Sequence, residues 1–168
     1  MTTDTIGRFE RSLAALEVTS EVVPASAASE RIGTAVDDPA VGTALPFEGA
    51  SLPDAVTAEP TPAELENAAT GVTPASFAVA EHGTVAIASS ERGDEPVSLY
   101  PDRHVAVVAG SDVVADLGDG FDRLLEGFSD GRESVVFATG RSATADMGGL
   151  VHGVHGPGEG HVVVLEDR

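Results

Sequence analysis

The apolar residues of this chain alternate between helical and strand-like spacing. Ile6, Phe9 and Leu13 recur every three or four positions, which predicts an amphipathic helix over 5–17. Three further helices are expected, over 26–36, 62–70 and 111–128. Short apolar runs predict strands near 21–23, 41–45, 77–80, 84–88, 105–109, 134–138 and 161–165. Because strands and helices alternate, the sequence predicts a three-layer α/β/α fold with a mostly parallel sheet.

The helix expected over 111–128 has a wide apolar face. Ser111 is its predicted cap, and the face is expected to be buried. Its members are Val114, Leu117, Phe121, Leu124, Leu125 and Phe128. Elsewhere, loops are expected over the proline-rich residues 37–62, the polar residues 89–102 and the glycine-rich residues 147–160.

The charge balance limits which solvent environments and which classes of binding partner are expected for this chain. The 168 residues include 28 acids and 9 bases, all of them arginine, for a formal net charge of −19. Repulsion among the acids destabilises a compact state at low salt, and about 1 M salt screens it by shortening the Debye length to roughly 3 Å. The composition therefore resembles that of haloarchaeal proteins and predicts a salt-rich cytoplasm. Phosphate binding needs clustered Lys and Arg, so a nucleic-acid partner is not expected.

Cysteine is absent from the chain. A disulfide framework, a thiol nucleophile and a cysteine-held iron–sulfur cluster are therefore excluded within the chain, and any cluster would belong to a partner. The first residues lack the pattern of a signal peptide, and no apolar run approaches the roughly 20 residues of a membrane span. A cytoplasmic protein without membrane association is the expectation.

Three loops carry the candidate site residues. Sites in open α/β sheets cluster at the carboxyl ends of strands, and we expect the three loops to share one cleft there. The first loop holds Glu81, His82, Gly83 and Thr84. A carboxylate before a glycine turn can act as an acid, base or nucleophile, whereas a plain hairpin turn with a solvated Glu81 is the alternative.

The second loop spans 139–146 and combines a glycine with polar side chains. Gly140 permits a close backbone approach, and Ser142 or Thr144 can cap the next turn and leave N–H groups free for an anion. Arg141 can clamp a carboxylate or phosphate. The alternative is a polar connection, ending at Asp146, with a surface arginine.

The third loop is rich in histidine. His152, His155 and His161 are three of the five histidines of the chain, separated by Gly153 and Gly156 among others. Hydrogen bonding of His152 or His155 to a ligand is the favoured function. A metal site formed by the three imidazoles is a weaker alternative, and a glycine-rich turn with structural histidines is the third.

Common nucleotide and hydrolase fingerprints are missing. The chain contains neither GxGxxG nor GxxxxGK[ST] nor GxSxG. Dinucleotide binding, P-loop chemistry and α/β-hydrolase chemistry therefore have no direct support.

Four motifs in series resemble a known family. They are GVTPASFAVAEHGT (71–84), LYP followed by Arg and His (99–104), TGRSATADM (139–147) and GVHGP (153–157). In this order and spacing they resemble the LUD domain, the lactate-utilisation protein C family, over roughly 65–168.

This resemblance implies a fold like that of ribose-5-phosphate isomerase, glucosamine-6-phosphate deaminase and the CoA transferases. It also implies a role in oxidising L-lactate to pyruvate with separate iron–sulfur subunits. A single domain over 1–168 is expected, with a divergent part (1–62) and a motif-bearing part (63–168). The candidate catalytic residues are Glu81, His152 and His155, and the ligand-binding set is Gly83, Thr84, Gly140, Arg141, Ser142, Thr144, Asp146, Gly153 and Gly156.

Two positions depart from the family pattern. The family usually has threonine where this chain has His82, and proline where it has Arg141. Three functions stay open. The first is a lactate-oxidation subunit in which Arg141 holds a carboxylate and His152 or His155 moves a proton. The second is a stand-alone enzyme on a sugar phosphate or acyl-CoA that uses Glu81, and the third is a non-catalytic scaffold or sensor.

Overall fold

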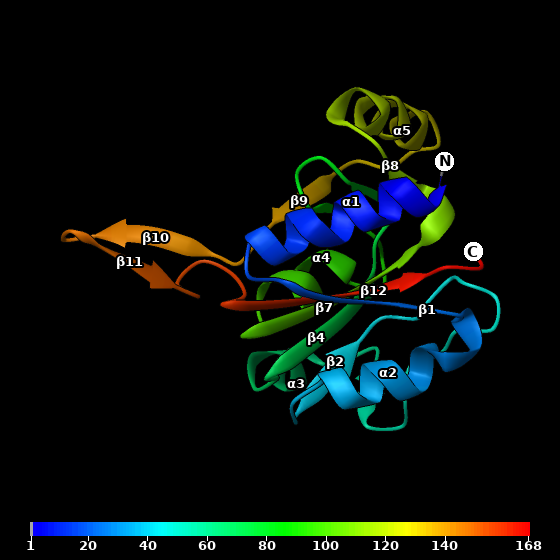
Figure 1. The fold of residues 1–168 in the computed structure, drawn as a ribbon. Coiled ribbons are helices and arrows are strands. Elements are labelled where there is room, and N and C mark those ends of the chain that lie inside the picture. The colour runs from blue at the N-terminus through cyan, green and yellow to red at the C-terminus, as the bar shows by residue number, and fades with distance from the viewer. Residues whose placement is uncertain (1) are drawn as a thin grey trace.

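A six-stranded parallel sheet forms the centre of the computed structural model, which describes residues 2–168 (Figure 1). The strand order is β1-β12-β7-β4-β2-β3, and each neighbouring pair is parallel. The strands are β1 (Thr19–Val23), β2 (Ala40–Gly42), β3 (Val56–Ala58), β4 (Thr70–Pro74), β7 (Arg103–Ala109) and β12 (Glu159–Leu165). The first and last parts of the chain therefore meet in one sheet, where β1 pairs with β12.

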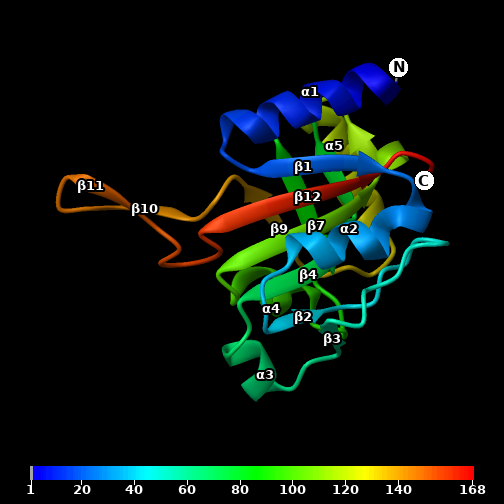
Figure 2. The same cartoon turned by 60° about the horizontal axis from the view of Figure 1, so that its bottom comes forward.

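The two faces of this sheet are covered differently (Figures 1 and 2). Helix α2 (Ala28–Ala35), preceded by the 3₁₀ turn η1 (Ala25–Ala27), covers one face. Helix α1 (Thr2–Ala15) and a second sheet of order β8-β5-β6-β9 cover the other. Its strands are β5 (Phe77–Val79), β6 (Thr84–Ala88), β8 (Val113–Val114) and β9 (Val135–Thr139). The predicted three-layer fold with a mostly parallel sheet is confirmed.

Two apolar cores lie on the two faces of the central sheet. Phe9 and Leu13 of α1 are at most 1% exposed and pack with Val108 of β7 against the second sheet. On the opposite face, Ile32 of α2 packs with Val107. Both cores use alternate residues of β7, which explains why that strand is an uninterrupted apolar run.

Apart from the hairpin described below, three elements lie where loops were predicted or where no element was expected. These are β3, β4 and the helix α4 (Asp94–Leu99). Strand β4 contains a glycine, two threonines and a proline, so it lacks an apolar run, yet all five of its residues are buried by pairing with β2 and β7. The short helix α3 (Pro62–Glu66) agrees with the prediction, and Thr61 and Glu64 form a capping box there.

The predicted helix over 111–128 is wrong in its first part and in its buried face. Residues 110–114 form the 3₁₀ turn η2 (Gly110–Asp112) and β8, and α5 spans Leu117–Ser129. Asp116, not Ser111, caps α5 by accepting from the backbone N–H of Asp119 at 3.1 Å. The apolar stripe of α5 is largely exposed: Leu117 38%, Phe121 51%, Leu125 62% and Phe128 43%.

Helix α5 packs on the second sheet through a glycine instead of through this stripe. A Cβ atom at Gly120 would lie 3.1 Å from Val79 and 3.4 Å from Phe77. This close contact places α5 outside the second sheet, and Figure 1 shows it as the outermost helix on that side. The apolar stripe therefore faces away from the core.

The residues that follow β9 form a projecting hairpin. Strands β10 (Ala143–Asp146) and β11 (Gly149–His152) pair in antiparallel fashion and extend away from the body of the protein (Figures 1 and 2). These residues were predicted as loop. Strand β9 was predicted as buried but is an edge strand, and Phe137 on it is 39% exposed.

Across residues 2–168, none of the helices combines the length and apolar character required to cross a membrane.

The packing of α1 gives the first prediction. Phe9→Ala removes a fully buried ring and should lower the free energy of unfolding by about 3–5 kcal/mol. Phe121→Ala, on the exposed stripe of α5, is the matched control and should change it by less than about 1 kcal/mol. Urea titrations followed by circular dichroism in concentrated KCl would measure both. Equal losses would show that α1 is not the main cover of this face.

Candidate functional site

A small cavity of about 60 Å³ lies between the central sheet, the second sheet and α4. Its polar lining includes Ser98, His104, Ser142 and backbone at three glycines, Gly83, Gly140 and Gly160. Apolar residues of α1, β6 and β7 complete its wall. The cavity thus brings together residues of the three loops chosen from the sequence, of which the first lies more than 50 positions before the other two.

The cavity lies near the amino ends of β7 and β12, not at the carboxyl edge that was predicted. His104 is the second residue of β7, and Glu159 and Gly160 open β12. The prediction assumed that the loops follow strands of the central sheet. The first two loops instead follow β5 and β9 of the second sheet, whose strands run partly antiparallel.

Helix α4 reaches the cavity because Gly71 allows it to lie directly on β4. A Cβ atom at Gly71 would collide with the carbonyl oxygen of Val97 and approach Pro101 to 3.0 Å. With hydrogen in that place, α4 packs on β4 and directs Ser98 and Leu99 into the cavity wall. The glycine of the GVT motif is therefore a packing requirement of this site.

His104 is the buried titratable group of the cavity. Its side chain is 6% exposed, and its Nε2 lies 2.9 Å from Thr73 Oγ1. No residue that the structure describes hydrogen-bonds its Nδ1. Burial lowers the pKa of His104 to about 4, so the ring is neutral at pH 7. A neutral imidazole can hydrogen-bond a ligand without placing a cation in the cavity, and if it accepted a proton it would become an imidazolium cation, which burial disfavours.

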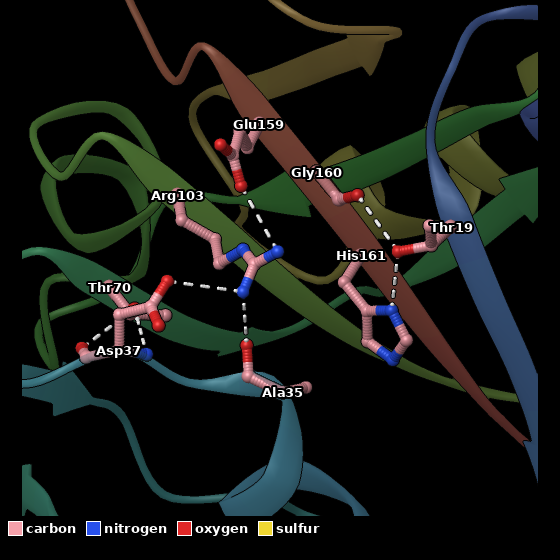
Figure 3. Close-up of polar contacts among 8 residues, drawn as sticks. All are labelled: Thr19, Ala35, Asp37, Thr70, Arg103, Glu159, Gly160 and His161. Atoms are coloured by element: carbon pink, nitrogen blue, oxygen red, sulfur yellow. Dashed lines mark hydrogen bonds and ion pairs between the residues drawn. The ribbon is translucent and has the colours of Figure 1, made fainter.

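A polar network lies on the opposite face of the same sheet edge (Figure 3). Arg103 donates to the carbonyl of Ala35 at 2.9 Å and pairs with Asp37 at 3.2 Å and Glu159 at 3.0 Å. His161 Nδ1 lies 2.8 Å from Thr19 Oγ1. These contacts join β1, β7, β12 and the end of α2, so the network fixes the strands that carry His104.

His161 is held in the neutral form by its surroundings. Burial is the main cause that lowers the pKa of His161; the carboxylate of Glu21 opposes it, and Arg103 and Arg31 add to it. Since adjacent strand residues point to opposite faces, the ring of His161 lies with the α2 side and the ring of His104 with the α1 side. His161 also belongs to the lining of the cavity, but its ring points to the other face of the sheet, so the two imidazoles do not face one another.

The predicted catalytic side chains lie outside the cavity lining. Glu81 is 41% exposed, and its carboxylate lies 3.9 Å from Arg8 of α1 and 4.0 Å from His82. His152 ends the exposed strand β11, and His155 lies in the exposed turn after it. None of these three carboxylate and imidazole groups reaches His104 in this arrangement.

The predicted ligand-binding residues divide into two groups. Gly83, Gly140 and Ser142 line the cavity. Thr84 hydrogen-bonds Thr139 at 2.7 Å between β6 and β9, and Arg141 pairs with Glu17 at the end of α1. The others lie along the projecting hairpin and its turn: Thr144, Asp146, Gly153 and Gly156. The side chain of Asp146 lies outside what the structure describes.

The turn after β11 forms a hollow of its own. Gly153, His155 and Gly156 line it together with Tyr100 and Asp102. The weak metal alternative required His152, His155 and His161 to converge, but His161 is buried against Thr19. Among the described side chains, no three potential metal ligands come together.

His104 and Ser98 are the site residues that sequence reasoning missed. Ser98 is 3% exposed and donates to the carbonyl of Glu95 at 2.7 Å. Ser98 lay in the segment taken for a polar loop, so nothing marked it. For His104 a signal was present: it directly precedes the apolar run 105–109, and a polar residue that enters a buried strand needs a partner or a function.

Comparisons with known proteins agree on the family. The LUD domain matches residues 14–165. "Lactate utilization protein C" from Bacillus licheniformis is 36% identical over 107 residues, which are 61% of this chain and 45% of that protein. The proteins of the same name from Bacillus subtilis and Deinococcus radiodurans are 33% and 32% identical, over 61% of this chain and 45% and 49% of theirs. This chain thus spans about half the length of these relatives.

A solved structure shows the same fold. The crystal structure of a DUF162 family protein from Deinococcus radiodurans superimposes with a TM-score of 0.77. It covers 98% of both chains at 22% sequence identity. At this identity the likeness supports the architecture alone.

The buried His104 predicts acid sensitivity. Its pKa is about 4 in the folded protein and near 6.5 when unfolded, so the unfolded state takes up a proton first as the pH falls. Its contribution to stability is complete above pH 6.5 and is lost between pH 6.5 and 4, by about 3 kcal/mol in total. Denaturant titrations at several pH values should show a shallower acid loss for His104→Gln than for the wild type.

His82 provides the control for this experiment. Its side chain is 50% exposed, so His82→Gln should keep the pH dependence of the wild type. If His104→Gln showed the same pH dependence as His82→Gln, His104 would not be buried in the neutral form.

Proposed function

Because this chain belongs to the LUD domain family, we propose that it is a subunit of a lactate-utilisation system that oxidises L-lactate to pyruvate with separate iron–sulfur proteins. The observation that carries the proposal is the family match over 14–165, joined to relatives named lactate utilization protein C. These relatives are about twice as long, so the activity of the whole protein comes to this chain only as part of the proposal.

The electron balance of the reaction indicates which steps this chain could perform and which its partner proteins would perform. Oxidation of L-lactate to pyruvate releases two electrons and two protons. The chain has no cysteine, the usual ligand of iron–sulfur clusters, so the electrons would pass to clusters held by partner proteins. What this chain can supply is binding and the handling of a proton.

The cavity around His104 suits that part of the work. Its volume of about 60 Å³ admits a group of a few atoms, such as the hydroxyl-bearing end of a small acid. The neutral imidazole of His104 can hydrogen-bond a hydroxyl or carbonyl oxygen and accept a proton. Ser98 and Ser142 line the same cavity and add hydroxyl groups.

The exposed stripe of α5 supports an assembled protein. Leu117, Phe121, Leu125 and Phe128 present a continuous apolar surface that the chain itself does not cover. Such patches on soluble proteins mark interaction sites. Asp119, Asp122 and Glu126 lie on another side of the helix. We assign the stripe to a partner protein with an apolar surface bordered by basic residues, because that partner would also complement the acids on the neighbouring side of the same helix.

Growth on lactate tests the function. Loss of the gene should abolish growth on L-lactate and leave growth on pyruvate intact. A copy with His104→Gln should restore lactate oxidation at least about a hundredfold less well than the wild type, which is the lower range for a lost general base. His82→Gln is the control and should restore it fully. Full restoration by His104→Gln would show that the cavity is not needed for lactate oxidation. Normal growth of the deletion strain on lactate would contradict the proposed function as a whole.

Co-purification tests the docking surface. Leu125→Asp places a charge in the middle of the α5 stripe and should lower recovery of the iron–sulfur partners at least about tenfold, while the chain stays folded. Leu150→Asp, at a residue of similar exposure on the hairpin, is the control. If the change instead turned a dimer of this chain into a monomer, the stripe would be a contact between copies and the assignment to a partner would be wrong.

A further inference from the structure

A second and larger cavity lies at the carboxyl ends of the central strands, opposite to the cavity of His104. Its volume is about 410 Å³, within the roughly 300–1,000 Å³ typical of ligand sites. Three segments line it: Pro46 and Phe47 after β2, residues 74–76 at the end of β4, and residues 88–90, 92 and 94 from the end of β6 to the start of α4. Asp112 and Arg132 complete the lining.

This cavity lies where the chain paths leave the sheet in opposite directions. After β2 the chain continues to β3, on one side in the strand order. After β4 it passes through the second sheet and returns to β7, on the other side. The carboxyl ends of β2 and β4 therefore form a topological switch point, where ligands bind in open parallel sheets because the diverging connections leave a crevice.

One of the arginines that line the cavity has no ion-pair partner among the described residues. Arg92 lies 3.6 Å from the buried Asp94, and Asp112 lies 3.4 Å from Arg123. No residue that the structure describes forms an ion pair with Arg132. Arg132 is exposed, and its guanidinium lies against Gly127 of α5 at the border of the cavity. In a chain with 28 acids and 9 bases, a lining arginine without an acidic partner favours an anionic ligand.

Two hydroxyl groups face the same space. Ser90 is committed to Asp94, which also accepts from Thr43. Ser76 and Ser89 also line the cavity, and no described residue hydrogen-bonds either hydroxyl. The backbone N–H of Ser76 donates to Ala86 of β6 and that of Ser89 donates to Ser134, just before β9, which holds the backbone of both serines in place. The cavity lining thus offers one arginine without an acidic partner and two serine hydroxyl groups without a described hydrogen-bond partner.

We propose that this switch-point cavity binds the carboxylate of a small organic molecule, with Arg132 as its cationic partner and Ser76 and Ser89 as hydrogen-bond donors. Arg132 is the one lining arginine without an acidic partner among the described residues, and a monoanionic carboxylate would supply one negative charge to it. A phosphate dianion would carry a second charge toward Asp94 and Asp112, which disfavours it. The inference goes beyond the proposed function and does not rest on it, because it uses neither His104 nor a partner protein.

A titration followed by NMR tests this site with acetate, succinate and inorganic phosphate as probes. The isolated ¹⁵N-labelled chain would be studied in about 2 M KCl to screen its acidic surface. The amide signals of Ser76 and Ser89 and the side-chain Nε–H of Arg132 should shift and saturate with a carboxylate and not with phosphate. Arg132→Gln should raise the dissociation constant by about tenfold or more, as expected for a lost charged hydrogen bond.

Arg11 supplies the matched control. It lies exposed on α1, and no described residue forms an ion pair with it, so Arg11→Gln makes the same charge change away from the cavity. Ser76→Ala is a second variant and should weaken binding severalfold. The proposal is overturned if no saturable shift occurs at these residues, if Arg132→Gln and Arg11→Gln behave alike, or if phosphate binds in place of the carboxylates. Lactate oxidation is not measured, so this result and the growth test fail independently.

Discussion

The seating of α4 on β4 is the contact on which both cavities depend. Gly71 has no side chain, and the backbone of Val97 occupies the space that a Cβ atom would fill. The two ends of α4 then reach opposite edges of the sheet. Asp94 at its start lines the switch-point cavity, and Ser98 near its end lines the cavity of His104. A displacement of this one helix would therefore change both sites together.

The second sheet gives the fold its unusual cover. In a doubly wound fold, helices cover both faces of the parallel sheet, but here β5, β6 and β9 cover much of one face next to α1. The connections of this second sheet bring the turns at Gly83 and Gly140 to the amino ends of β7 and β12. The same arrangement leaves α5 on the outer side, so its apolar stripe has no core to join. The second sheet is thus the cause of both the small cavity and the exposed stripe.

Local patterns predicted the parts of the fold that carry their own signal. The helix around Phe9 and the strand after His104 have the expected periodicity, and both lie as predicted. Strand β4 and α4 could not be found this way, because β4 is buried by its neighbours in the sheet and α4 follows a polar turn. The prediction that the stripe of α5 is buried was wrong. An amphipathic pattern shows that one face of a helix is apolar, but it does not show that residues of the same chain pack against that face. Gly83, Gly140 and Ser142 meet at one cavity, whereas the side chains chosen for catalysis, Glu81, His152 and His155, do not line it.

Charge decides how the two cavities differ. Seven of the nine arginines form ion pairs with acids among the described residues, as expected when acids outnumber bases threefold. The cavity of His104 contains no arginine, and burial keeps its imidazole neutral, so it can recognise a hydroxyl or carbonyl group but has no cation for a carboxylate. The switch-point cavity has the reverse character, with Arg132 unpaired beside two hydroxyl groups. The two cavities lie at opposite ends of the central strands, with α4 between them. An acid that needed both kinds of recognition would therefore have to use more than one site.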